Sequence, residues 1–121
     1  MSKRILVIED QEDNRRILRH LLKSVDYEVL EAVTGEDGVA LAERERPDLI
    51  LMDIQLPGLD GYEATRRIKA NPVLRHIPII VVTSYALSGD DVKAFDAGCD
   101  AYVTKPFSPR QLLAKIQDHL Q

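Results

Sequence analysis

The feature that most constrains the fold of this chain is the alternation of short apolar runs with segments of helical periodicity. The runs are too short for helices and are bounded by turn residues, whereas the segments between them space apolar side chains three or four positions apart. This alternation predicts βα units and a parallel sheet with helices on both faces. The predicted strands are residues 5–8, 27–32, 49–52, 77–82 and 100–104, and the first helical stripe is Ile17, Leu18, Leu21, Leu22 and Val25.

The composition of each run predicts its place in the sheet. The first, third and fourth runs are continuously apolar, as strands covered on both faces are, while the second alternates and the fifth is short and mixed. With right-handed crossovers these constraints favour the strand order 2-1-3-4-5, a doubly wound (βα)5 flavodoxin-like sandwich. Ligands of such sheets bind outside the carboxyl ends of the strands, at the switch between strands 1 and 3. We therefore expect the functional site just after residues 8 and 52.

Capping residues support the helix boundaries. Thr34, Asp60, Ser88 and Ser108 are predicted N-caps, and Pro109 occupies the favoured first position of the last helix. The helices they begin separate the predicted strands, so the capping chemistry agrees with the alternation.

Three acids follow the two strands at the predicted switch. Glu9 and Asp10 come directly after strand 1, and Asp53 ends strand 3. Two unit charges ~4 Å apart repel by about 4 kcal/mol at an effective dielectric constant of ~20, so a cation, a basic side chain or a raised pKa must relieve the repulsion. Oxygen-only ligands favour Mg²⁺. The alternative is that Glu9 and Asp10 are only capping acids of the loop.

Two more strand ends face the same crevice. Strand 4 ends in Thr83-Ser84, which supplies hydroxyl groups, and strand 5 ends in Lys105-Pro106, which supplies an ammonium group. A carboxylate nucleophile, a metal site, a hydroxyl and a cation are the parts needed to transfer a phosphoryl group onto aspartate. In this interpretation Lys105 helps to balance the charge of Asp53.

Four motifs in this order carry a family resemblance: VIED at 7–10, LILMDIQLPGLDG at 49–61, VVTSYA at 81–86 and YVTKPF at 102–107. The chain resembles the receiver domain of two-component response regulators over residues 1–121. The resemblance implies that a histidine kinase or histidine phosphotransfer protein phosphorylates Asp53. It also implies Mg²⁺ bound by Asp10, Asp53 and the backbone carbonyl of Gln55, with Glu9 acting through water.

The resemblance assigns further roles around the phosphorylation site. Thr83 and Lys105 would hold the phosphoryl oxygens, the Lys105–Pro106 bond would be cis, and the ring of Tyr102 would turn inward on activation. Gln55 and Ser84 lie where family members vary in dephosphorylation rate. The protein would therefore be a switch that catalyses only its own phosphorylation and dephosphorylation, and not an enzyme with an external substrate.

We expect one domain and no output domain, because the sequence ends with the last predicted helix. Output would then be protein–protein contact through residues 85–121, or a role as a relay or phosphate sink, and the resemblance allows a homodimer. The net charge of −4 argues against direct nucleic-acid binding. No segment is apolar enough to insert into a membrane, and a single cysteine, Cys99, fits a reducing cytoplasm. The cluster Arg15, Arg16, Arg19 and His20 is either a docking site for the phosphodonor or a solvated helix face.

Two other function classes compete with the switch. A haloacid-dehalogenase-type phosphatase also uses an aspartyl phosphate, but its general acid would fall on Gln55, which carries no carboxyl proton. A flavodoxin-like redox carrier would need a hydroxyl- and glycine-rich phosphate loop after strand 1. This chain has EDQED there, at residues 9–13, which would repel a flavin phosphate.

Overall fold

A computed structural model describes residues 2–84 and 90–120. Its five parallel strands are ordered β2-β1-β3-β4-β5, which confirms the predicted topology. The elements follow one another as β1 (Arg4–Ile8), α1 (Glu12–Lys23), β2 (Glu28–Ala32), α2 (Gly35–Glu45), β3 (Leu49–Met52), α3 (Gly61–Ala70), β4 (Ile79–Thr83), α4 (Asp90–Ala97), β5 (Ala101–Thr104) and α5 (Pro109–Leu120).

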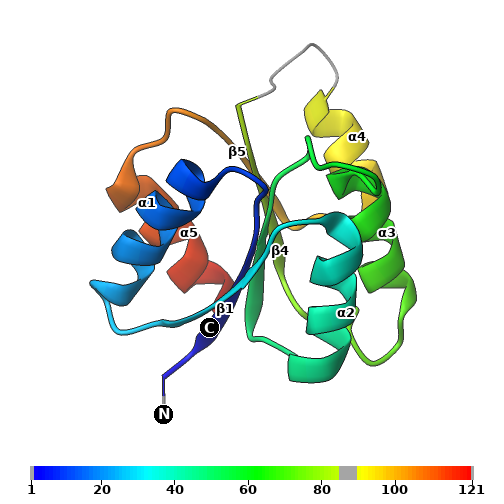
Figure 1. The fold of residues 1–121 in the computed structure, drawn as a ribbon, viewed down its shortest axis with the longest axis horizontal. Helices are drawn as coiled ribbons and strands as arrows, with labels where there is room; N and C mark the ends of the chain where they lie inside the picture. The colour runs from blue at the N-terminus through cyan, green and yellow to red at the C-terminus, as the bar shows by residue number, and fades with distance from the viewer. Residues whose placement is uncertain (1, 85–89, 121) are drawn as a thin grey trace.

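The sheet lies between two helical layers. Helices α1 and α5 cover one face, and α2, α3 and α4 cover the other (Figure 1). Alternate residues of β1 enter the two cores: Ile5 and Val7 pack toward α1 and α5, while Leu6 and Ile8 pack toward α2 and α3. Because side chains alternate across a strand, burial on both faces requires the continuous apolar runs in the sequence.

Two sequence-predicted boundaries differ from the structure by two residues, and the other strand boundaries agree within one residue. Strand β4 begins at Ile79 instead of residue 77, because the Ile77 N–H donates to the Leu74 carbonyl (2.9 Å) and closes a turn. Helix α1 ends at Lys23, so Val25 lies beyond it and is 43% exposed. Ile17, on the predicted apolar stripe, is also exposed, at 57%. The buried residues of α1 are Leu18 and Leu22.

The caps that fall on described residues behave as predicted. Thr34 accepts a hydrogen bond from the Asp37 N–H (3.0 Å), and Asp60 accepts one from the Glu63 N–H (2.9 Å). Ser108 Oγ lies 3.4 Å from its donor, the N–H of Gln111. The fourth predicted cap, at residue 88, lies outside the described residues.

One glycine is required where α3 begins. A Cβ at Gly61 would lie 2.1 Å from the carbonyl oxygen of Asp53 and 2.7 Å from the Cα of Ile54. The start of α3 therefore packs directly against the backbone at the end of β3, which fixes the loop that follows Asp53. No helix within residues 2–84 and 90–120 is long and apolar enough to cross a membrane.

Candidate functional site

Three carboxylates converge at the carboxyl end of the sheet, where the strand order reverses. Strands β1 and β3 are neighbours with Ile8 opposite Met52, so the residues that follow them lie side by side. One oxygen from each of Glu9, Asp10 and Asp53 lies within 4.8 Å of the others. The predicted acidic cluster is therefore brought together by the sheet register.

Asp53 is buried, with 8% of its surface exposed. Its Oδ1 accepts a hydrogen bond from the backbone N–H of Ile54 (2.8 Å). Burial, followed by the negative charge of Glu9, raises the pKa of Asp53 to about 6, although Lys105 acts in the opposite direction. The ionised form of this carboxylate is thus disfavoured in the folded protein without a cation.

Lys105 forms its ion pair with Glu9, at 2.6 Å between Nζ and Oε1. The sequence analysis expected Lys105 to balance the charge of Asp53, which follows β3. In the structure the direct contact of Lys105 is with Glu9, which follows the neighbouring strand β1. Burial raises the pKa of Glu9, but the hydrogen bonds from Lys105 and from the Gln11 N–H (3.1 Å) outweigh burial and lower it overall. Glu9, only 2% exposed, is therefore held as an anion.

Asp10 is half-buried at the rim of the cluster. Burial and the neighbouring Glu9 raise the pKa of its carboxyl group. Three carboxylates with one lysine among them leave an excess of negative charge, and every side-chain atom they offer to a metal is a carboxylate oxygen. This donor set fits Mg²⁺, with the carboxylates of Asp10 and Asp53 best placed to hold it and Glu9 already engaged by Lys105.

The other predicted residues occupy neighbouring strand ends. Thr83 is fully buried at the end of β4, and its carbonyl accepts a hydrogen bond from the Lys105 N–H (2.8 Å). Ser84 follows it and is exposed. Tyr102 is half-buried on β5 and packs against the core on the α2–α4 face. Gln55 is exposed in the loop after Asp53.

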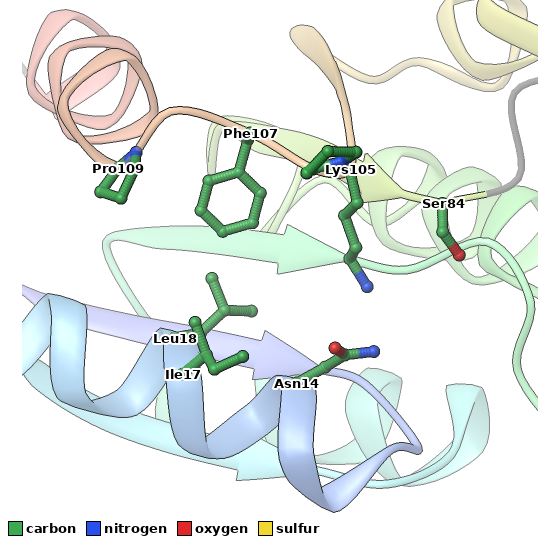
Figure 2. A pocket seen from close by; sticks show the side chains of 8 residues that line it. Asn14, Ile17, Leu18, Ser84, Lys105, Phe107 and Pro109 are labelled. Carbon is green, nitrogen blue, oxygen red and sulfur yellow. The ribbon is translucent and has the colours of Figure 1, made fainter.

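The Lys105–Pro106 peptide bond is cis. A cavity of about 530 Å³ opens beside the Lys105 side chain, between α1 and the segment joining β5 to α5 (Figure 2). Figure 2 shows the Phe107 ring above Leu18, with Asn14 at the end nearer the lysine ammonium group. The cavity is lined by Asn14, Ile17, Leu18, Ser84, Lys105, Pro106, Phe107 and Pro109.

Sequence reasoning missed one residue of this region. Arg15, assigned either to a docking cluster or to a solvated face, instead has a side chain only 13% exposed and bonds to the loop that carries Glu9 and Asp10. Its position five residues after Asp10 contained no signal of this, because an arginine on the first turns of a helix is usually solvated.

The comparisons with known proteins decide the family. Residues 5–117 match the response regulator receiver domain family. The chain is a receiver domain of the response regulators. Its membership makes it a component of two-component signalling, and nothing found supports the phosphatase alternative.

Relatives match this receiver domain over nearly their whole length. The polar-differentiation response regulator DivK of Brucella anthropi is 41% identical over 120 residues, covering 99% of this chain and 98% of DivK. The receiver domain of a sensor histidine kinase from Pseudomonas aeruginosa PAO1 is 40% identical, with a TM-score of 0.92 and 99% and 98% coverage. That structure contains a magnesium ion coordinated in its active site cleft. A response regulator from Chloroflexus aurantiacus is 28% identical, with a TM-score of 0.95 and the same coverage.

Proposed function

We propose that this receiver domain accepts a phosphoryl group on Asp53 from the phosphorylated histidine of a kinase or phosphotransfer protein, in a Mg²⁺-dependent reaction. The observation that carries the proposal is the convergence of the Glu9, Asp10 and Asp53 carboxylates within 4.8 Å, next to the Lys105 ammonium group. A buried acid whose ionised form is disfavoured by burial and by a neighbouring acid is costly to keep unless a bound cation compensates its charge.

In the proposed step, an oxygen of Asp53 attacks the phosphorus atom. The new bond joins that oxygen to phosphorus, and the phosphorus–nitrogen bond of the donor breaks, with the electron pair leaving on the imidazole. The hydrogen bond from the Ile54 N–H to Oδ1 fixes the orientation of the carboxylate. Bound Mg²⁺, held by Asp10, Asp53 and the Gln55 carbonyl, would supply positive charge for the phosphoryl oxygens. The protein would turn over no substrate but its own aspartyl phosphate.

The response would begin at the two residues beside the phosphoryl group. Thr83 and Lys105 would bind its oxygens, so that Lys105 gives up part of its contact with Glu9 and Thr83 shifts toward Asp53. Because Tyr102 lies on the strand next to Thr83, its ring would move inward with that shift. Exposed Ser84 and Gln55 flank the site and would set the access of water, hence the dephosphorylation rate.

Partners would meet two surfaces. The cavity between α1 and the β5–α5 segment opens beside Lys105 and presents exposed Ile17, so we assign the phosphodonor to it. The surface formed by α4, β5 and α5 would bind a downstream protein or a second copy of the chain. Val92 and Phe95, one helical turn apart on α4, are 59% and 50% exposed there. We expect a single-domain cytoplasmic protein that does not bind nucleic acid directly.

The test is phosphorylation by a small donor. Wild-type protein incubated with acetyl phosphate and MgCl₂ should gain one phosphoryl mass that is acid-stable and base-labile, and Asp53→Asn should gain none. Beryllofluoride binding gives an independent readout if the small donor reacts slowly. An equal adduct on Asp53→Asn, or neither adduct nor beryllofluoride binding on the wild type, would rule the proposal out.

A further inference from the structure

Arg15 reaches back from α1 to the loop that precedes the helix. Its Nη1 donates to the backbone carbonyls of Glu9 and Asp10, both at 3.0 Å. These carbonyls precede the N-cap Gln11 and have no part in the α1 hydrogen-bond ladder. An unpaired carbonyl away from water is costly, so Arg15 supplies the partners that the helix cannot.

The guanidinium group is itself fixed on its other edges. Its Nη2 pairs with Glu12, and its Nε lies 3.4 Å from Glu31 Oε1 on β2. Arg19, one turn further along α1, holds that same Glu31 through two hydrogen bonds of 2.7 and 2.8 Å. The Arg19 bonds also lower the pKa of Glu31, so the acid stays ionised as a support for Arg15. Arg15 is therefore braced between two elements of the fold.

The residues whose carbonyls Arg15 holds are the two that carry the acidic pair. Glu9, Asp10 and Asp53 repel one another, and this repulsion pushes the β1–α1 loop away from β3. Without a fixed backbone, the loop could turn the half-buried Asp10 carboxylate toward solvent at little cost in free energy. Arg15 opposes that movement from behind the loop.

We infer that Arg15 is a positioning residue of the phosphorylation site, which fixes the backbone of Glu9 and Asp10 so that their carboxylates face Asp53 and the Asp10 carboxylate can bind a divalent cation together with it. This inference rests on the proposed function, because it assigns the role of Arg15 in that same site.

The experiment compares Arg15→Met with Arg16→Met. Arg16 is the next residue on α1, its side chain is 57% exposed, and it forms an ion pair with the surface acid Asp13. Both variants lose one positive charge near the site, which by Coulomb's law alone would tighten cation binding. Mg²⁺ affinity is measured by titrating MgCl₂ and following the NMR chemical shifts of the backbone amides of Gln11 and Ile54. These amides donate to the carboxylates of Glu9 and Asp53.

Arg15→Met should weaken Mg²⁺ binding about tenfold, the lower range for loss of an outer-shell partner of a metal ligand, while Arg16→Met stays within about twofold of the wild type. Arg15→Lys, which keeps the charge and can donate to the loop, should recover part of the loss. Urea unfolding verifies that each variant is folded. If Arg15→Met is not folded, Arg15→Lys against Arg16→Lys decides, with weaker binding expected only for the former.

Two results overturn different conclusions. If the wild type binds Mg²⁺ and is phosphorylated on Asp53, but the Arg15 variants bind Mg²⁺ as well as the Arg16 variants do, the role of Arg15 is refuted and the proposed function stands. If the wild type neither binds Mg²⁺ nor accepts a phosphoryl group, the proposed function itself is refuted.

Discussion

Replacing Asp53 with Asn should stabilise the protein in the absence of divalent cations. Asn keeps an oxygen that can accept the Ile54 N–H and removes one of three crowded charges. The pKa of Asp53 rises from 3.8 to about 6 on folding. At roughly 1.4 kcal/mol per pKa unit, the ionised carboxylate costs the folded state about 3 kcal/mol. Since the side chain is 8% exposed, solvent screening reduces this value little.

The sign of the pH dependence follows from the same shift. The folded state binds the Asp53 proton more tightly than the unfolded state, so the contribution to stability is complete below pH 3.8 and is lost as the pH rises through about 6. The stabilisation gained by Asp53→Asn should therefore be about 3 kcal/mol near pH 7.5 and about half of that near pH 5.

The measurement is urea unfolding in EDTA, followed by circular dichroism at both pH values. Asp13→Asn is the matched control, because its side chain is 84% exposed in a surface ion pair and should change the free energy of unfolding by less than about 1 kcal/mol. Saturating MgCl₂ should stabilise the wild type and narrow its difference from Asp53→Asn. A gain below about 0.5 kcal/mol near pH 7.5, or one that does not fall near pH 5, would refute the conclusion that burial and the charge of Glu9 penalise the ionised form of Asp53.

Three further variants test other contacts. Lys105→Met should destabilise the cation-free protein by about 3 kcal/mol, because it leaves buried Glu9 without its ion-pair partner, and MgCl₂ should restore part of the loss in a thermal melt. Ile17→Glu should block phosphorylation by a histidine kinase that phosphorylates the wild type, yet leave the reaction with acetyl phosphate intact, because Ile17 lines the cavity assigned to the phosphodonor. Val25→Glu is the control, because Val25 is exposed beyond the end of α1. Equal rates of phosphorylation by the kinase for the two variants would show that the phosphodonor does not bind at the cavity. Gly61→Ala should lower the free energy of unfolding by more than about 2 kcal/mol, because its Cβ meets backbone atoms that cannot turn away, and an unchanged urea midpoint would contradict this.

The fold and the site's location were predictable because each depends on backbone pattern. Continuous apolar runs identify buried strands, and parallel strands bring their carboxyl ends to one edge, so Asp10 and Asp53 had to meet. The side-chain contacts were less accessible. Lys105 has four flexible carbons, and its choice of Glu9 over Asp53 depends on a few ångströms within a site that the strand order alone does not resolve.

The apolar spacing of a helix also did not predict which of its individual residues are exposed. The apolar spacing of α1 includes Ile17, but the helix presents Leu18 and Leu22 to the sheet and leaves Ile17 beside the cavity. For Arg15 the error is the opposite one. A charged residue on a helix is expected to be exposed to solvent, whereas the guanidinium group of Arg15 turns back to the preceding loop. A periodicity argument assigns faces to a helix and carries no information on where a long side chain ends.

The charge balance of the site explains why a cation and a phosphoryl group should act together. The ionised carboxylates of Glu9, Asp10 and Asp53, set against the single ammonium of Lys105, leave two negative charges, which one divalent cation neutralises. A phosphoryl group on Asp53 replaces one negative charge by about two. Without the cation, the phosphorylated site would carry an excess of about three negative charges in a buried setting, where each added charge is expensive. The raised pKa of Asp53, the stabilisation expected from Asp53→Asn and the expected requirement for Mg²⁺ therefore share one physical origin, which is the burial of Asp53 in a site with more negative than positive charge.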